Sequence, residues 1–366
     1  MKIVVIGTRG FPGVQGGVEN HCENLYPELV KQGCDVTVFS RSPYVGGNGG
    51  IYEGVKLVAL DCPRNKFLEA IVHTFMSVLK ARMLNPDIVH IHAVGPSLFA
   101  PLARILGMKV VVTSHGPDYM RKKWNLPAKI FLRFCERMGM VFANEVITIA
   151  KNIADNIKNK YGRDSAIIPN GVNIPSLAET ETSLKNFGIK KGKYALSVGR
   201  FVPEKGFDDL IDAFNRGGFT GWKLVIIGDA DHEDKYSRGL KAKTGNNPDI
   251  VLTGFLKGEP LHEFYSHAGL FVLASYYEGL PIVLLEAMSY GLSCIASDIP
   301  ANRNVNLEEN RFFKTGDIKA ISKKIEEYIH EPWNEAERQK QINMIINKYN
   351  WRKIAEETFK VYRKIV

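Results

Sequence analysis

Apolar residues along the chain gather in short runs rich in Val and Ile, and longer segments of helical periodicity separate these runs. The runs are continuously apolar instead of strictly alternating, which is typical of parallel strands that helices cover on both faces. The pattern therefore predicts an α/β protein with two doubly wound domains in succession. Ten strands are expected, at residues 2–7, 34–40, 87–93, 109–115, 145–150, 194–200, 222–229, 250–255, 270–275 and 293–298, with a first helix at about 18–31.

The division between the domains is expected where turn-forming and polar residues accumulate, near residues 169–193. A chain of 366 residues accommodates two domains of about 170 residues each. Ligands of doubly wound sheets bind at the carboxyl ends of the strands, so residues that carry chemistry are expected there. The predicted parts are a Rossmann-like domain (1–172), a linker (173–192), a second Rossmann-like domain (193–350) and a last helix (351–366).

Composition narrows the class of protein. Hydrophobic residues make up 45% and charged residues 24%, which excludes a disordered or fibrous chain. No run of 18 apolar residues occurs, and the first residues lack a signal-peptide pattern, so we expect a cytoplasmic protein without a membrane-spanning helix. The cysteines have neither metal-ligand nor disulfide spacing and are expected to be reduced thiols: Cys22, Cys34, Cys62, Cys135 and Cys294.

Positive charge is concentrated in the first half of the chain. Residues 1–170 contain 21 Lys and Arg against 13 Asp and Glu, a balance of +8 out of the total of +9. Within residues 119–138, Lys129, Arg133 and Arg137 recur every four residues beside apolar side chains. Such a helix can lie on an anionic membrane, which predicts a peripheral position on the inner face of the cytoplasmic membrane. The alternative is a core helix with a solvated basic face; no nucleic-acid motif accompanies it, so no nucleic acid is expected.

The first predicted strand runs into a glycine-rich loop, GTRGFPGVQGGVEN at residues 7–20. Such a loop before a helix lets backbone N–H groups approach an anion closely. It is not the dinucleotide fingerprint, because Arg9 stands where glycine is needed, and no Gly-Lys-Ser/Thr follows as in a P-loop. The alternative is a tight turn that needs glycine for backbone reasons alone.

The second domain opens with two cations in the loop after its first strand. Arg200 and Lys205 lie at the carboxyl end of that strand, where two cations can neutralise a diphosphate. The alternative is a solvated pair in a surface loop.

The segment at 274–292 joins a strand end to an apolar helix. Glu278 lies in the loop, and Pro281 suits the first turn of the helix. The N–H groups at 282–284 would then be free to hold phosphate. Glu286 falls in the second turn, where a buried carboxylate needs a hydrogen-bonding partner such as ribose hydroxyls. The alternative partner is a neighbouring Arg or Lys.

Together, the spacing of Arg200 and Lys205 and that of Glu278 and Glu286 resemble the signature of retaining GT-B glycosyltransferases of family 4. The glycine-rich loop, SHG at 114–116 and NGV at 170–172 fit the same pattern, so the resemblance covers essentially the whole chain. Residues 115–124 are more loosely similar to a rhamnosyltransferase-like subgroup of polysaccharide biosynthesis.

The resemblance implies two facing Rossmann-like domains, the first on the acceptor side, with a C-terminal helix that crosses back to the first. It implies transfer of a sugar from a nucleotide-diphosphate sugar to a glycan or lipid-linked acceptor, with retention by front-face attack and without a metal cofactor. The implied catalytic residues are His115, Arg200, Lys205 and Glu278. Donor-binding residues are implied at Gly16, Gly17, Arg200, Lys205, Leu256, Glu278, Gly279, Leu280, Pro281, Ile282, Val283 and Glu286, and acceptor-side residues at His92, Asp118 and Arg121.

Two other patterns have a metal interpretation. Asp229 and Asp231 form a D-x-D pair, which we interpret as a polar turn instead of a metal site. His90 and His92 share one face of a strand, but no third ligand at suitable spacing is evident, so packing is predicted. Two other functions stay open: a non-catalytic partner that binds nucleotide-sugar or glycan, and a nucleotide-sugar epimerase of the same architecture.

Overall fold

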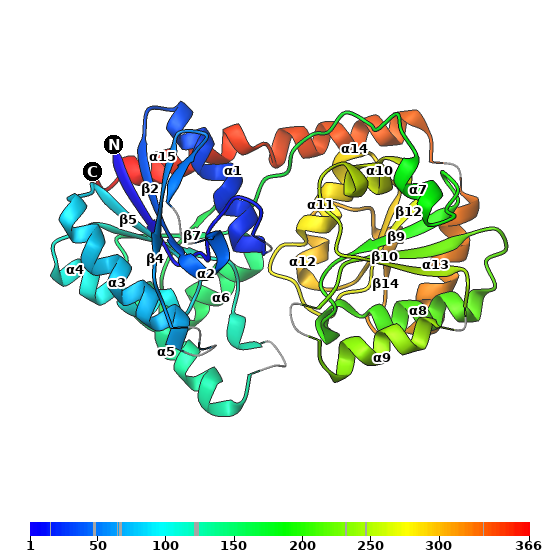
Figure 1. The fold of residues 1–366 in the computed structure, drawn as a ribbon, viewed down its shortest axis with the longest axis horizontal. Coiled ribbons are helices and arrows are strands. Elements are labelled where there is room, and N and C mark those ends of the chain that lie inside the picture. Colours follow the sequence, from blue (N-terminus) through cyan, green and yellow to red (C-terminus); the bar gives the residue numbers. More distant parts are fainter. Residues whose placement is uncertain are drawn as a thin grey trace. The chain divides into compact units, whose positions relative to one another are not determined.

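The computed structural model describes residues 1–366 except 15, 47–48, 64, 66–67, 121–123, 231–232, 246 and 332. The chain forms two compact units, one of residues 1–171 and 349–366 and the other of residues 172–348. Each unit has its own sheet, which is almost entirely parallel (Figure 1). Each of the ten strands expected from the sequence is present, so the predicted α/β class is confirmed.

The first unit contains an eight-stranded sheet of order β3-β4-β2-β1-β5-β6-β7-β8. Only β3 runs antiparallel to its neighbour. Three strands of this sheet were not predicted from the sequence: the short edge strands β3 and β8, and β4, which lies between β3 and β2. The strand bounds are β1 Lys2–Ile6, β2 Asp35–Arg41, β3 Gly50–Tyr52, β4 Val55–Leu60, β5 Ile88–His92, β6 Val110–Ser114, β7 Glu145–Thr148 and β8 Ala166–Ile167.

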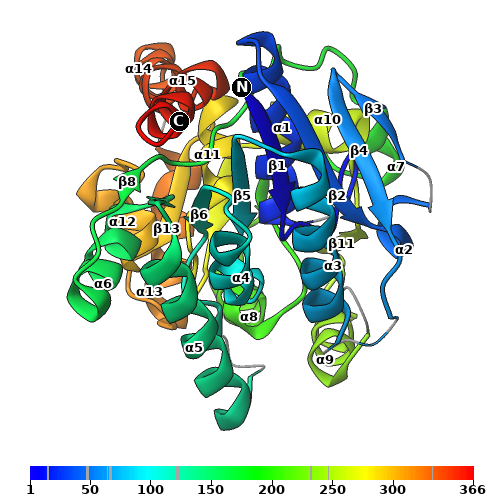
Figure 2. The ribbon, with the colours of Figure 1, turned by 90° about the vertical axis from the view of Figure 1, so that its left-hand side faces the viewer.

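Helices cover both faces of this sheet (Figures 1 and 2). One face is packed by α1 (Gly17–Lys31) and α15 (Trp351–Arg363), and alternate residues of β1, Ile3 and Val5, join them in one buried core. The C-terminal helix therefore belongs to the first unit. The opposite face is covered by α3 (Leu68–Leu84), α4 (Ala100–Ile105) and α5 (Leu126–Phe142), and the remaining elements are α2 (Ser42–Val45), η1 (Pro96–Phe99), η2 (Asp118–Met120) and α6 (Lys151–Tyr161).

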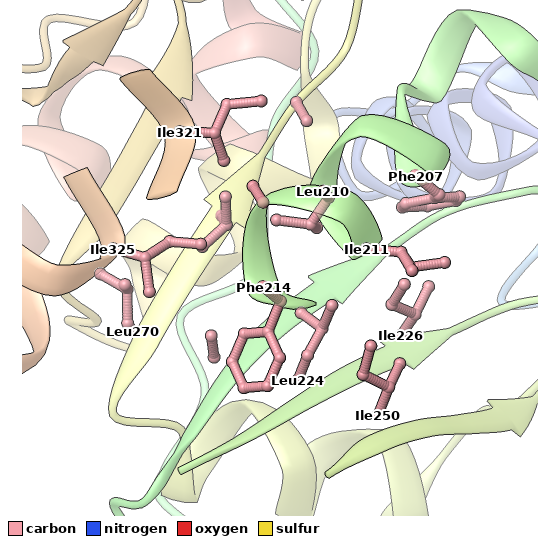
Figure 3. Close-up of a cluster of buried hydrophobic side chains, with 14 of the residues drawn as sticks. Phe207, Leu210, Ile211, Phe214, Leu224, Ile226, Ile250, Leu270, Ile321 and Ile325 are labelled. Carbon is pink, nitrogen blue, oxygen red and sulfur yellow. The ribbon is translucent and has the colours of Figure 1, made fainter. Parts of the chain in front are cut away.

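The second unit contains a six-stranded parallel sheet of order β11-β10-β9-β12-β13-β14. Its core packs α8 (Phe207–Gly217) and α13 (Ile318–His330) against the sheet (Figure 3). On α8, Phe207, Leu210, Ile211 and Phe214 follow the i, i+3, i+4, i+7 spacing of one helical face. The strand bounds are β9 Tyr194–Val198, β10 Lys223–Ile227, β11 Ile250–Gly254, β12 Leu270–Leu273, β13 Cys294–Ser297 and β14 Phe312–Phe313. The remaining elements are α7 (Thr182–Asn186), η3 (Pro203–Lys205), α9 (Lys235–Thr244), α10 (Glu259–His267), α11 (Ile282–Ser289), α12 (Pro300–Arg303), η4 (Glu309–Arg311) and α14 (Glu335–Lys348).

Residues 173–192, which we expected to be a linker, pack within the second unit. Leu184 on α7 is fully buried, and Ile189 is nearly so. The Ala178 N–H donates to the hydroxyl of Ser266, and the Ser183 N–H donates to the carboxylate of Glu263. The segment therefore contributes to the fold of this unit, because buried apolar side chains and hydrogen bonds to α10 anchor it.

Candidate active site

The donor residues predicted in the second unit lie in loops at the carboxyl ends of two neighbouring strands, β9 and β12. The loops touch through their backbones: the Tyr276 N–H donates to the carbonyl of Glu204 at 2.8 Å. Gly206 has a φ of +64°, and a Cβ there would lie 2.4 Å from the Ala274 carbonyl oxygen. Glycine is therefore required at this crossing, and it lets the two loops present their side chains together.

Lys205 and Glu278 form an ion pair across these loops. The Nζ of Lys205 lies 2.6 Å from Oε1 of Glu278, and the side chains are only 18% and 11% exposed. Ser275 donates a second hydrogen bond to the same carboxylate oxygen at 2.7 Å. A buried pair of this kind costs free energy if either partner is removed, because the other charge is left unpaired. Arg200, half-buried, follows β9 in the same loop.

Glu286 lies in the second turn of α11 and is partly buried. The hydroxyl of Tyr265 donates to its Oε2 at 3.0 Å. Desolvation raises the pKa of Glu286 to about 7, although the Tyr265 hydrogen bond and the charge of Lys205 oppose this rise. Its hydrogen-bond partner is therefore a tyrosine, instead of the Arg or Lys considered above. About half of these carboxyl groups are therefore ionised at neutral pH.

The start of α11 differs in detail from the sequence-based expectation. Pro281 is the N-cap residue, so the helix begins one residue later, at Ile282. The Ile282 N–H donates to the Leu280 carbonyl at 2.9 Å, and the Leu284 N–H donates to the Pro281 carbonyl at 3.0 Å. Two of the N–H groups predicted to be free for phosphate therefore already have carbonyl partners. Gly279 and Val283 lie in the same loop and first turn and are partly buried.

Two predicted residues of the second unit lie apart from this pair of loops. Leu256 follows β11, which the sheet order places two strands away from β9. Asp229 follows β10, where it accepts a hydrogen bond from the Ala230 N–H and lies 3.1 Å from Lys241. Desolvation by itself would raise the pKa of Asp229, but the hydrogen bonds from Ala230 and Lys241 outweigh it, so the pKa is lowered. These contacts fit the polar turn that we predicted; Asp231 lies outside the described residues.

In the first unit, the glycine-rich loop is tied to the start of α1 by Glu19. Both the backbone N–H and the guanidinium of Arg9 donate to its carboxylate, at 3.1 and 3.2 Å. Glu19 is buried, and a Cβ on Gly16 would lie 2.0 Å from its Oε2. Gly17 is the first residue of α1. A carboxylate thus already occupies the positive end of the helix, where it competes with any phosphate. This favours the tight-turn interpretation.

A cluster of histidines lies at the carboxyl ends of β5 and β6. The register pairs His92 with Thr113, and His115 follows on the same face two residues later. The Nδ1 of His92 therefore lies 3.0 Å from the Nε2 of His115. His90 contacts the hydroxyl of Tyr362 through Nδ1 at 2.6 Å and that of Thr113 through Nε2 at 2.7 Å. Both His90 and His92 are fully buried.

His21 on α1 joins this cluster and was missed by the sequence reasoning. Its ring centroid lies 5.4 Å from that of His92 and 5.1 Å from that of His115. One ring nitrogen from each of the three lies within 4.8 Å of the others. His90 is not one of the three and is held by hydroxyls, as the predicted packing implies, whereas the group around His92 is completed by His115 and by a residue from a helix far away in the sequence. The spacing of His21, Leu25 and Leu29 on the buried face of α1 was the available signal.

Burial keeps the clustered imidazoles neutral. Desolvation lowers the pKa of His21 to about 4, and the neighbouring Asn170 side chain opposes this shift. Desolvation, reinforced by His21, lowers the pKa of His90 to about 3. Desolvation and the surrounding histidines likewise lower the pKa of His92 and of His115. None of these rings is therefore a general acid at neutral pH.

Two further residues, Asp118 and Arg121, were predicted on the acceptor side. Asp118 begins the η2 turn three residues after His115 and is partly buried. Arg121 lies outside the described residues.

Comparison with known protein families shows to which class of enzyme the chain belongs. The model of the family described as Glycosyltransferase Family 4 matches residues 15–175, and that of Glycosyl transferases group 1 matches residues 179–350. Together the two models match nearly the whole chain, which is therefore a family 4-like glycosyltransferase. Among its relatives, the putative teichuronic acid biosynthesis glycosyltransferase TuaC of Bacillus subtilis (strain 168) is 25% identical over 74% of this chain and 67% of that protein. A UDP-Gal:alpha-D-GlcNAc-diphosphoundecaprenol alpha-1,3-galactosyltransferase of Escherichia coli is 29% identical over 62% of this chain and 61% of that protein.

Solved structures of family 4-like enzymes share the fold. Sucrose-phosphate synthase from Thermosynechococcus elongatus matches with a TM-score of 0.85 and 19% identity, over 100% of this chain and 98% of that one. Anabaena HepE in complex with UDP and glucose matches with a TM-score of 0.82 and 16% identity, over 100% of both chains. The GT-B architecture predicted from the sequence is therefore confirmed.

Proposed function

We propose that this glycosyltransferase moves a hexosyl or deoxyhexosyl group, with retention, from a nucleotide-diphosphate sugar to a glycan or lipid-linked acceptor. Its class, a glycosyltransferase of polysaccharide biosynthesis, follows from the family and its relatives. The donor class is supported by the UDP-glucose complex of HepE, and a lipid-linked acceptor by the diphosphoundecaprenol acceptor of the Escherichia coli relative. The observation that carries the proposal is the Lys205–Glu278 ion pair at the ends of β9 and β12.

In this proposal, Lys205 and Arg200 bind the diphosphate of the donor. Negative charge grows on the diphosphate as the glycosidic bond breaks, and a fixed cation in a poorly hydrated site stabilises that charge. Glu278 holds Lys205 in place before the donor arrives, because it pairs with the ammonium group at 2.6 Å and is itself fixed by Ser275. Its remaining acceptor capacity can receive hydrogen bonds from hydroxyls of the donor sugar.

Glu286 binds the ribose in this proposal. An ionised carboxylate accepts hydrogen bonds from ribose hydroxyls, and Tyr265 already orients one of its oxygens. Because the pKa of Glu286 is about 7, donor binding favours the ionised form and draws a proton off the protein.

Retention is proposed to occur by attack on the face from which the diphosphate departs. The bond between the anomeric carbon and the phosphate oxygen breaks, and the acceptor oxygen bonds to the same face of that carbon. The departing phosphate oxygen takes the acceptor's proton. No divalent metal on the diphosphate is invoked, because Lys205 and Arg200 supply the positive charge.

The outer surface of α5 supports peripheral membrane binding. Leu126, Ile130 and Phe134 recur every four residues and are 68%, 57% and 50% exposed. The basic side chains Lys129, Arg133 and Arg137 form a second stripe beside them. Apolar and basic stripes together allow a helix to lie in the interface of an anionic membrane. Among the described residues, no helix is both long and apolar enough to cross a bilayer.

The test is NMR of the protein with candidate nucleotide-sugars, with and without polyprenyl-diphosphate sugar acceptors. Transfer only when an acceptor is present, with the donor's anomeric configuration kept, is the expected result. An inverted product would overturn the retaining mechanism. Donor isomerisation without acceptor would indicate an epimerase, and donor binding without any turnover would indicate a non-catalytic partner.

A further inference from the structure

We propose that His21, His92 and His115 form a binding site for a transition-metal ion of the zinc type in the first unit. All three ligands come from this unit, and the donor diphosphate residues all belong to the second. The site therefore goes beyond the proposed sugar transfer. The inference rests on three observations: the spacing of the ring nitrogens, the lack of a well-formed hydrogen bond to the His21 ring, and the hydrogen bonds that orient His92.

The spacing is that of a three-histidine site. One nitrogen from each ring lies within 4.8 Å of the other two. Zinc binds imidazole nitrogen at about 2.0–2.1 Å, so two ligands of one ion are at most about 4.2 Å apart. A small ring rotation closes the remaining difference. The closest pair, His92 Nδ1 and His115 Nε2, is already 3.0 Å apart.

The ring nitrogens of His21 are buried and available to bind a metal ion. The residue is only 3% exposed, and neither ring nitrogen has a partner of good hydrogen-bond geometry among the described residues, although the Asn170 side chain lies close enough to interact with the ring. Buried polar atoms are normally hydrogen-bonded, so a buried imidazole without a well-formed hydrogen bond requires an explanation. Its ring contacts those of His92 and His115 on one side and Trp351 on another, at 5.6 Å between centroids. Rotation toward an ion would therefore disturb no more than the weak interaction with Asn170.

The hydrogen-bond network behind His92 points its Nδ1 into the cluster. The hydroxyl of Tyr26 contacts both His92 Nε2 and His90 Nδ1. When Nε2 of His92 donates to Tyr26, Nδ1 is left as a lone pair facing His115. Partners of this kind, behind the ligating atoms, fix the tautomer of metal-binding histidines. His115 then moves its proton from Nε2 to Nδ1, a tautomer change that leaves every ring neutral.

The chemistry of the ligands selects the class of ion. Neutral imidazoles are required for metal binding, and burial keeps the pKa of each ring below its usual value. A set of three nitrogens suits zinc, cobalt, nickel or copper and not magnesium or calcium, which prefer oxygen. Three protein ligands leave a fourth position for water or another oxygen. His115 is only half-buried, so this position can open to solvent.

The experiment measures zinc binding by the full chain after EDTA treatment and dialysis. Zinc is titrated by calorimetry in competition with a chromophoric chelator, and cobalt absorption reports the ligand geometry. We expect one equivalent to bind, with a tetrahedral cobalt spectrum. His21→Gln and His115→Gln should each weaken zinc binding by more than the 10- to 100-fold typical of losing an outer partner, and Tyr26→Phe should stay within that range.

His73→Gln is the matched control. His73 on α3 is also buried with neither ring nitrogen in a well-formed hydrogen bond, but it is not part of the cluster. It should bind zinc like the unaltered protein, and circular dichroism establishes that each variant is folded. No zinc bound by the folded, unaltered protein would overturn the proposal, and so would equal binding in the His21→Gln and His115→Gln variants. Sugar transfer is not used as the readout, so failure here leaves the proposed function untouched.

Discussion

The two units stabilise buried polar groups at the ends of their strands in contrasting ways. The second unit uses charge: Lys205 is paired with Glu278, and Glu286 retains an ionisable carboxyl beside Tyr265. At the ends of β5 and β6 the first unit uses neutral rings and hydroxyls, with His90 and His92 joined to Tyr26 and Tyr362, although the loop after β1 also holds the Arg9–Glu19 ion pair. Charged anchors suit a phosphate-bearing donor, whereas neutral imidazoles suit a metal ion or a hydroxyl.

The largest expected effect comes from removing the cation of the Lys205–Glu278 ion pair in the second unit. Lys205→Ala removes the cation that stabilises the leaving diphosphate, so we expect turnover to fall by about 10²–10³-fold, or roughly 3–4 kcal/mol in the barrier. The control is Lys243→Ala, because Lys243 forms a partly exposed ion pair with Asp212 in the same unit. Initial rates of sugar transfer measure both. Turnover near normal in the Lys205 variant would remove this residue from the site.

A smaller effect is expected from the pH dependence of Glu286. With a pKa of about 7, its ionised fraction rises from about a tenth at pH 6 to about nine tenths at pH 8, so donor affinity should rise by up to roughly tenfold. Calorimetry with an intact nucleotide-sugar measures this, because its diphosphate does not titrate in this range. Glu286→Gln should bind with little pH dependence; an equally steep profile in that variant would contradict the assignment.

The Glu286 carboxyl group also affects stability, and this effect depends on pH in the opposite direction to its effect on donor affinity. Its folded pKa of about 7 exceeds the ordinary value of 4.5, so the folded state holds the extra proton between these values. The free energy of unfolding of the second unit should therefore fall as pH rises from about 4.5 to 7. Urea titrations of the unaltered protein and of Glu286→Gln test the sign. A steeper fall in the variant would be the wrong direction.

In the histidine and tyrosine network of the first unit, we expect the hydroxyl of Tyr362 to affect the stability of the fold and not the rate of sugar transfer. Tyr362→Phe removes the 2.6 Å partner of His90 Nδ1 and leaves only the Tyr26 hydroxyl at 3.0 Å, so it should lower the free energy of unfolding by about 0.5–1.5 kcal/mol. Denaturant unfolding measures it. Tyr44→Phe serves as the control because Tyr44 is 40% exposed. Equal losses in both variants would mean that the buried network contributes no more than a surface hydroxyl.

The smallest effect concerns the basic stripe of α5. Arg133→Glu should weaken binding to anionic vesicles by about 2 kcal/mol at low salt, since each basic group near the surface contributes about 1 kcal/mol and the reversal adds repulsion. Lys340→Glu is the control, because Lys340 is an exposed residue of the second unit. Co-sedimentation with phosphatidylserine vesicles measures both. Equal binding to neutral vesicles would exclude an electrostatic surface.

The sequence predicted those features whose signal is local. Continuous apolar runs identified ten strands, but β4 was missed because only its first and last residues are fully buried. Arg200, Lys205, Glu278 and Glu286 were proposed as site residues because their spacing along the sequence is recognisable. The partners that fix them were not, since Ser275 and Tyr265 have no distinguishing pattern of their own.

Features that depend on distant segments could not be predicted in this way. His21 reaches His92 and His115 because α1 packs against the sheet, and the local pattern of residues 17–31 indicates only that His21 lies on the buried face of the helix, not what it meets there. Glu19 could have been anticipated as an acidic residue in the first turn of a helix, but its pairing with Arg9 depends on how the glycine-rich loop folds back.

The most direct test of the central claim is calorimetric titration of the full chain with UDP, GDP, ADP and dTDP in the presence of EDTA. The account predicts tight binding of one nucleotide, with affinity lost in Lys205→Ala and kept in Lys243→Ala. Binding that appears only after manganese is added would contradict a diphosphate site built from Lys205 and Arg200. Absence of binding under both conditions would contradict a nucleotide-sugar donor altogether.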